Sequence, residues 1–155
     1  MKLYLLRHAD AETEAPTDDE RPISERGRQQ SKRVAAFCER RNLKPDIILT
    51  SPLRRAQQTA KIVADGLAIE LKTVPWLASG AAADRVLVEL NARRKLSSVM
   101  LVGHEPDFGL LVAHLLGIGK GAGVRLRKAS LSLLELTAFR GGGAHLEWSI
   151  PARLM

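Results

Sequence analysis

Short apolar runs alternate with longer amphipathic stretches along the chain, and this alternation limits the possible fold more than any other feature. The mostly apolar runs at residues 3–6, 47–50 and 98–102 have the length of strands. Such runs are typical of strands that are buried on both faces of a parallel sheet. Stretches with the apolar spacing of helices follow them. This order predicts an α/β fold, in which a mostly parallel sheet is covered by helices on both faces.

Capping and turn signals predict the other elements of a three-layer sandwich. Four segments are predicted to be helices: residues 24–41, 53–65, 83–94 and 105–116. Ser24 is a suitable N-cap for the first helix, and Gly66 is expected to end the second. Three further strands are predicted: residues 69–74, 131–137 and 146–150. The last two form an antiparallel hairpin near the C-terminus, and loops are expected at residues 11–22 and 117–123.

The size and charge of the chain suit one basic globular domain, residues 1–155. Lys and Arg together number 24 against 17 Asp and Glu, which gives a formal charge of +7. This surplus favours anions such as phosphorylated groups, acidic protein surfaces or nucleic acid, without choosing among them. The single cysteine excludes an intramolecular disulfide, and no apolar run has the length of a membrane span or a signal peptide. We therefore expect a soluble cytoplasmic protein.

Three of the predicted strands end in polar residues. These are Arg7 and His8, then Ser51 with Arg54 and Arg55 just beyond it, and finally His104 with Glu105. Parallel strands bring their carboxyl ends to one edge of the sheet, where open α/β proteins bind ligands. Two histidines and at least two arginines at that edge suit a phosphoryl dianion, because the guanidinium fork matches phosphate oxygens. A neutral imidazole is also able to attack phosphorus. Each residue taken singly is compatible with a structural role, so the prediction depends on all three strand ends.

Three motifs in this order are identified as those of a known family. Residues 6–9 resemble the Arg-His-Gly signature of the histidine phosphatase (phosphoglycerate mutase-like) superfamily. Residues 51–59 resemble its second signature, and residues 102–105 resemble its third. The resemblance covers essentially the whole chain. The short length and the stretch at residues 21–24 are similar to the compact SixA-type phosphohistidine phosphatases.

The resemblance implies roles for individual residues. His8 would be the nucleophile, and Arg7 and Arg55 would hold the phosphoryl group, with Arg54 at a variable position. His104 would donate a hydrogen bond to the phosphoryl oxygens as charge develops in the transition state.

Two further residues are expected to bind substrate, and one position departs from the family pattern. Arg21 would add a substrate contact, although it is equally compatible with a role as a surface arginine, and Ser51 begins the second motif. Ala9 stands where the superfamily usually has glycine. Because a positive φ is costly for alanine, we expect this turn to adopt an ordinary conformation.

The three motifs do not assign an acid that protonates the leaving group. Larger members of the family carry this acid on an insertion after the second motif, but residues 74–84 contain no Glu and only Asp84. Asp10 and Glu105 are the candidates to replace it, and both are also compatible with roles as loop or cap carboxylates. A weak acid matters least for a phosphoramidate, so its absence favours phosphohistidine over sugar phosphates as the substrate.

The leading hypothesis is a phosphohistidine phosphatase that acts on a phosphotransfer protein. The same motifs would serve a phosphatase for small phosphate esters or polyphosphate-like anions, so both remain open. A non-catalytic module that binds phosphate or nucleic acid is a third hypothesis. The intact motifs argue against it, and only two Trp and one Tyr are available to stack on bases. The expected partner is thus a phosphorylated protein or a small phosphorylated anion, and no cofactor, metal, membrane or nucleic acid is expected.

Overall fold

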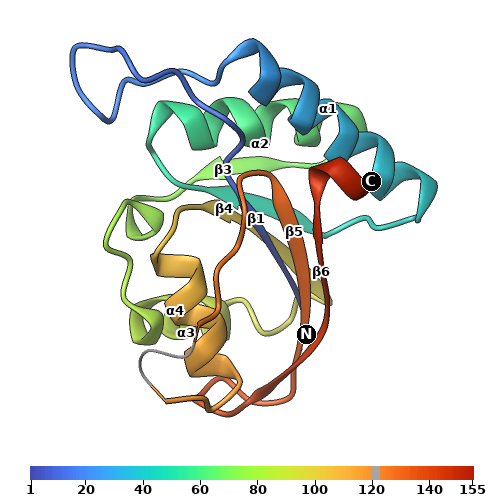
Figure 1. Cartoon of the computed structure of the whole chain (residues 1–155). Coiled ribbons are helices and arrows are strands. Elements are labelled where there is room, and N and C mark those ends of the chain that lie inside the picture. Colours follow the sequence, from blue (N-terminus) through green and yellow to red (C-terminus); the bar gives the residue numbers. More distant parts are fainter. Residues whose placement is uncertain (120–122) are drawn as a thin grey trace.

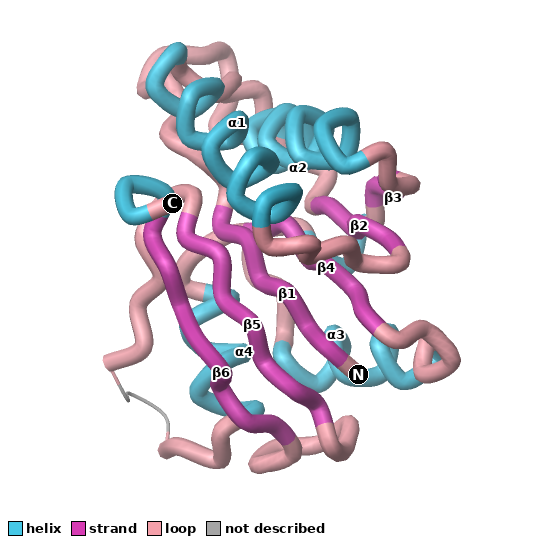
Figure 2. Tube along the Cα trace, turned by 90° about the vertical axis from the view of Figure 1, so that its right-hand side faces the viewer, coloured by secondary structure: helices cyan, strands magenta, loops and turns pink. Residues whose placement is uncertain are grey.

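The computed structural model describes residues 1–119 and 123–155 and contains a six-stranded sheet with the order β3-β2-β4-β1-β5-β6. Residues 120–122 of the expected glycine-rich loop lie outside the described residues. The strands are β1 (Lys2–Arg7), β2 (Ile47–Thr50), β3 (Leu71–Thr73), β4 (Ser98–Gly103), β5 (Ser130–Leu136) and β6 (Ala144–Pro151). The strands β1 to β4 pair in parallel, whereas β5 is antiparallel to both β1 and β6. Figure 2 shows β5 beside β1 and β6 beyond β5 at the edge of the sheet.

Helices cover both faces of the sheet (Figure 1). The helices are α1 (Glu25–Arg40), α2 (Arg54–Leu67), α3 (Ala83–Ala92) and α4 (Asp107–Leu115), together with the 3-10 turns η1 (Pro75–Leu77) and η2 (Ala152–Leu154). The first pair, α1 and α2, packs on one face, and α3 and α4 pack on the other. The predicted fold class, a three-layer α/β sandwich with an antiparallel C-terminal hairpin, is confirmed.

The alternation of side chains along β1 builds two separate cores. Leu3 and Leu5 pack into the core beneath α3 and α4, while Tyr4 and Leu6 pack into the core beneath α1 and α2. Successive side chains of a strand point to opposite faces, so a strand that is apolar at every position must be covered on both. This is why the short apolar runs of the sequence predicted the layered fold correctly.

The predicted start of α1 is confirmed, but the predicted end of α2 is wrong. The Ser24 hydroxyl accepts a hydrogen bond from the Gly27 amide at 3.1 Å, as an N-cap does. The helix α2 continues past Gly66 to Leu67, and Ala68 adopts the left-handed conformation with a φ of 54°. Gly66 instead lies against Ala35 of α1, where an added Cβ would come within 3.0 Å of the Ala35 Cβ. This glycine allows two helices to approach each other, which local sequence does not reveal.

Strand register sets the position of the site at one edge of the sheet. Arg7 of β1 lies opposite Gly103 of β4, and Thr50 of β2 lies opposite Val102. The ladder continues one residue further, because the His8 amide donates to the Gly103 carbonyl at 2.9 Å. The residues that directly follow β1, β2 and β4 are therefore neighbours in space, as their sequence pattern predicted.

Candidate active site

Two buried histidines form the centre of the site. His8 follows β1 and His104 follows β4, so two neighbouring parallel strands bring the rings together. The ring centroids lie 5.2 Å apart, and the ring planes are inclined by 53°. Only 7% of His8 and 3% of His104 is exposed to solvent. Both rings are therefore shielded from water, and they lie at the carboxyl ends of the parallel strands, where open α/β proteins bind ligands.

A backbone hydrogen bond determines the tautomer of His8. Its Nδ1 lies 2.7 Å from the carbonyl oxygen of Ala9. A carbonyl oxygen only accepts, so Nδ1 must carry the proton and donate it. In the neutral ring, Nε2 then carries the lone pair. This arrangement leaves Nε2 available as a nucleophile.

The surroundings of His8 keep its ring neutral. Burial is the main cause that lowers the pKa of His8 to about 3, against the opposing effect of the hydrogen bond to Ala9. The neighbouring His104 and two guanidinium groups, those of Arg55 and Arg7, lower this pKa further. His8 is therefore uncharged at neutral pH.

His104 is held by Ser51, which directly follows the adjacent strand β2. Its Nε2 lies 2.7 Å from the hydroxyl oxygen of Ser51, and that oxygen also accepts from the Leu53 amide at 3.2 Å. Among the described residues, the buried Nδ1 of His104 has no hydrogen-bond partner. Burial, followed by the charge of Arg55, lowers the pKa of His104 to about 4. Ser51 thus holds the second histidine in place and leaves Nδ1 as the available nitrogen.

The two arginines predicted to hold phosphate are placed differently. Arg55, at the start of α2, is only 6% exposed, and its guanidinium binds Asp18 through two hydrogen bonds. Arg7 is half-buried, and its Nη1 donates to the Leu126 carbonyl at 2.8 Å. Its buried Nε has no hydrogen-bond partner among residues 1–119 and 123–155. Arg54, which neighbours Arg55 in sequence, is exposed and lies outside the histidine pair.

Asp18 is a member of the site that the sequence analysis missed. Arg55 donates from Nη1 to the Asp18 carbonyl at 2.7 Å and from Nη2 to the Asp18 carboxylate at 3.0 Å. The hydrogen bond from Arg21, supported by that from Arg55, lowers the pKa of the Asp18 carboxyl. Asp18 and Arg55 are 37 residues apart, and no local pattern marks a loop aspartate as the partner of a helix arginine.

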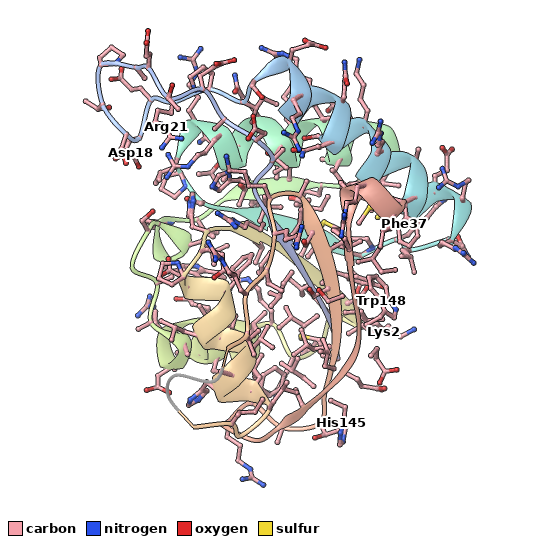
Figure 3. The ribbon with its side chains drawn as sticks, in the orientation of Figure 1. Lys2, Asp18, Arg21, Phe37, His145 and Trp148 are labelled. Atoms are coloured by element: carbon pink, nitrogen blue, oxygen red, sulfur yellow. The ribbon has the colours of Figure 1, made fainter. Side chains whose placement is uncertain are left out.

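Arg21 lies at the border of the site. Its Nη1 donates to the Asp18 carboxylate at 2.8 Å, and its Nε donates to the Glu12 carbonyl at 2.7 Å. Figure 3 shows Asp18 and Arg21 close together on the loop that follows β1. The structure therefore connects Arg21 to Arg55 through Asp18, and it places no direct contact between Arg21 and the two histidines.

The two candidate acids are both engaged in other contacts. Asp10 accepts hydrogen bonds at 2.7 Å from Lys128 and from the Ser24 hydroxyl. Burial alone would raise the pKa of Asp10, but the bonds from Lys128 and Ser24 outweigh it and lower this pKa. Glu105 accepts from the Leu126 amide at 3.0 Å. Both carboxylates thus hold the segment before β5 against the sheet.

Thr59 of α2 connects the two halves of the site and was also missed. Its hydroxyl accepts from the Ala9 amide at 3.1 Å and donates to the Arg55 carbonyl at 2.7 Å. Ala9 itself is buried and is not among the non-glycine residues with positive φ. The expected ordinary turn after His8 is therefore confirmed, and Thr59 fixes its distance from α2.

Within the described residues, no group of three or more His, Cys, Asp or Glu side chains is arranged to hold a metal ion. None of the helices in this part of the chain is both long enough and apolar enough to span a bilayer.

The fold and this cluster of histidines and arginines at its sheet edge define an α/β phosphatase. The chain belongs to the histidine phosphatase superfamily (branch 1), whose family model matches residues 3–79. It is 30% identical over 119 residues to the phosphohistidine phosphatase SixA of Escherichia coli K12, which covers 74% of each chain. It is 35% identical over 149 residues to an uncharacterized protein of a Picosynechococcus strain, which covers 90% of this chain and 88% of that one.

Solved structures show the same likeness over the whole chain. The protein histidine phosphatase SixA in complex with tungstate superimposes with a TM-score of 0.88 at 25% identity, and 99% of each chain is covered. A SixA structure from Agrobacterium tumefaciens superimposes with a TM-score of 0.82 at 25% identity, covering 96% of each chain. The predicted resemblance to the compact SixA type is confirmed by these relatives.

Proposed function

We propose that this phosphatase removes the phosphoryl group from phosphohistidine in a phosphotransfer protein, through a covalent intermediate on His8. The observation that carries the proposal is the state of His8. Its ring is buried and neutral, its Nδ1 is held by the Ala9 carbonyl, and Nε2 is left with a lone pair. Such an imidazole is a nucleophile that needs no separate base.

In the first step, Nε2 of His8 attacks phosphorus. Arg55 exchanges Asp18 for two phosphoryl oxygens, and Arg7 contributes its partly buried guanidinium. We assign the Ser51 hydroxyl as the donor in its 2.7 Å contact with Nε2 of His104. In the neutral ring Nδ1 then carries the proton and donates it to a phosphoryl oxygen. The bond between phosphorus and the substrate nitrogen breaks, and its electron pair returns to the substrate ring.

In the second step, water attacks the phosphoryl group on His8. A bond from the water oxygen to phosphorus forms as the bond to Nε2 breaks, and the electron pair returns to the imidazole. Of the two protons of this water, one stays on the phosphate and the other passes to solvent. Release of phosphate frees Arg55, which binds Asp18 again.

The positions of the carboxylates support a phosphoramidate as the substrate. Asp10 and Glu105 are engaged with the segment before β5. Arg21, whose hydrogen bond is the main cause that lowers the pKa of Asp18, stays bound to this carboxylate when Arg55 turns to the phosphoryl group. An ionised carboxylate has no proton to give to an alkoxide leaving group. Phosphohistidine takes a proton from solvent on its second ring nitrogen and leaves as neutral imidazole. The likeness to a protein named phosphohistidine phosphatase supports the same substrate class.

Hydrolysis of small phosphate esters is the second candidate function, and Asp18 is the observation that favours it. Once a phosphoryl group displaces Asp18 from Arg55, this carboxylate would lie beside the reacting oxygens. If it took up a proton there, it would serve as the acid for an ester leaving group.

Rapid quench with a radiolabelled phosphohistidine peptide tests the proposal. The wild type should yield an acid-labile, base-stable phosphoprotein whose formation precedes phosphate release. His8→Ala should abolish both the label and turnover, while His145→Ala, which alters an exposed histidine on β6, should retain both. A fully active His8→Ala protein would refute the covalent mechanism. A wild type that hydrolyses p-nitrophenyl phosphate but not the peptide would favour the second candidate.

A further inference from the structure

A basic cleft of about 620 Å³ opens beside Arg7, outside the histidine pair. Four segments form its walls: residues 7–10, the start of α1, residues 125–128 and residues 151–153. Its cationic side chains are Arg7, Arg26, Arg125, Arg127, Lys128 and Arg153. Figures 1 and 2 both show the C-terminal turn η2 beside α1. This contact brings residues 151–153 to the same cleft as α1.

The positive charge of the cleft is largely uncompensated. Asp10 is the one carboxylate among the residues that line it, and this side chain is paired with Lys128 at 2.7 Å. In the described part of the chain, no carboxylate oxygen lies within ion-pair distance of Arg26, Arg127 or Arg153. Several exposed cations around one opening repel each other, and a bound anion relieves that repulsion.

Arg7 belongs both to the cleft and to the surroundings of His8, since its charge contributes to lowering the pKa of His8. Arg7 lines the cleft, and it directly precedes His8 in the chain. Burial lowers the pKa of Arg7, the charge of Glu105 opposes this effect, and the charge of Arg125 lowers this pKa further. A substrate with its phosphoryl group at His8 would therefore present neighbouring groups to the cleft.

We propose that this cleft docks acidic side chains that border the phosphorylated histidine of the substrate protein, so that the enzyme selects its partner by charge. This inference rests on the proposed phosphohistidine phosphatase activity and adds a partner surface to it. The cleft is open and its cations are spread over four segments, which fits several carboxylates on a protein surface. Its lining contains no aromatic side chain on which a nucleic-acid base would stack.

Two synthetic phosphohistidine peptides of equal length test the inference. The acidic peptide has Asp and Glu around the phosphohistidine, and the neutral peptide has Asn and Gln at the same positions. For the wild type at low salt, kcat/KM should be on the order of tenfold higher for the acidic peptide, because several ion pairs add to its binding. The preference should disappear at an ionic strength of about 1 M, where charges are screened within ~3 Å.

Two matched double variants distinguish the cleft from the overall charge. Arg26→Gln with Arg127→Gln removes one cation from each of two walls and avoids Arg125, which influences Arg7. Arg94→Gln with Lys95→Gln removes the same charge from exposed positions before β4, at the opposite end of that strand from His104. The first variant should lose most of the preference for the acidic peptide, and the second should keep it with unchanged rates.

A binding measurement gives a readout that does not depend on turnover. In the His8→Ala background, fluorescence anisotropy should show tighter binding of the acidic peptide, and the cleft variant should lose this difference. Equal kcat/KM for both peptides in the wild type, or equal loss of preference in both double variants, would overturn the docking inference while the proposed activity stands. If the wild type cleaves neither peptide but hydrolyses p-nitrophenyl phosphate, the proposed substrate class and the docking inference both fall.

Discussion

Arg55 binds Asp18 with the same fork of donors that an arginine uses to bind phosphate. Its Nη1 reaches the Asp18 carbonyl at 2.7 Å, and its Nη2 reaches the Asp18 carboxylate at 3.0 Å. The arginine side chain is 7% exposed in this pair, whereas the aspartate side chain is 61% exposed. A phosphoryl group that takes both donors must therefore displace an exposed loop residue from a buried helix residue.

Removal of the Asp18 charge should strengthen the binding of phosphate. Asp18→Asn should lower the inhibition constant of inorganic phosphate by roughly two- to fivefold, because a partly exposed ion pair is worth less than about 1 kcal/mol. Competitive inhibition of p-nitrophenyl phosphate hydrolysis measures this constant. The matched control is Asp19→Asn, which removes the same charge from the next exposed residue. An equal change in both variants would show that the effect comes from overall charge.

Arg55 and Arg54 should differ strongly in their effect on activity. Arg55→Ala should reduce kcat/KM by roughly a hundredfold, or about 3 kcal/mol, because a buried bidentate contact to the transition state is lost. Arg54→Ala should change it little, since Arg54 is exposed and donates only to the Glu20 carbonyl at 3.4 Å. Steady-state kinetics with one substrate are sufficient. A larger loss for Arg54→Ala would show that Arg54, and not Arg55, is the arginine of the second motif that binds the phosphoryl group.

The two neutral histidines should make the free energy of unfolding depend on pH in the acid range. The pKa values of about 3 for His8 and about 4 for His104 lie below the ordinary value of 6.5. The unfolded chain therefore binds more protons than the native protein below pH 6.5, and the free energy of unfolding must fall as pH falls. The contribution of the two neutral histidines to stability is fully present above pH 6.5. Each histidine contributes a slope of up to about 1.4 kcal/mol per pH unit until the native ring takes up its own proton.

Urea unfolding between pH 7 and pH 4.5 measures this slope. His8→Asn should make the free energy of unfolding less dependent on pH, and His104→Asn should do the same. Carboxylates also titrate in this range, so His145→Asn provides the comparison for an exposed histidine. Identical slopes in the wild type and in the His8 and His104 variants would contradict the neutral, buried state of these rings.

The dependence of rate on the leaving group should reveal the missing acid. Across a series of phosphomonoesters, kcat/KM should fall steeply as the pKa of the leaving alcohol rises, because the carboxylates of the site are ionised or engaged. A phosphohistidine peptide should be cleaved far faster than an alkyl phosphate. Single Asp10→Asn, Asp18→Asn and Glu105→Gln variants provide the controls. If alkyl phosphate hydrolysis collapses in one of them, that carboxylate is the acid.

Local sequence patterns predicted the parts of the site that lie directly at strand ends. His8, Ser51 and His104 each follow a buried strand, and the topology of a parallel sheet brings such positions together whatever the intervening loops do. The end of α2 was predicted wrongly, because Gly66 resembles a helix-ending glycine but lies against Ala35 of another helix. Local propensity cannot distinguish these two uses of a glycine.

The sequence by itself determined the layered α/β fold and the meeting of two histidines with Arg7 and Arg55, because short-range periodicity and ordered motifs encode both. Only the tertiary structure decided that Asp18 binds the guanidinium of Arg55, and that Asp10 and Glu105 bind the segment before β5. It also decided that the cations of α1, residues 125–128 and the C-terminal turn share one cleft. These contacts join residues that are far apart in the chain, and their energies depend on distance and burial in the folded protein, which no local pattern of residues records.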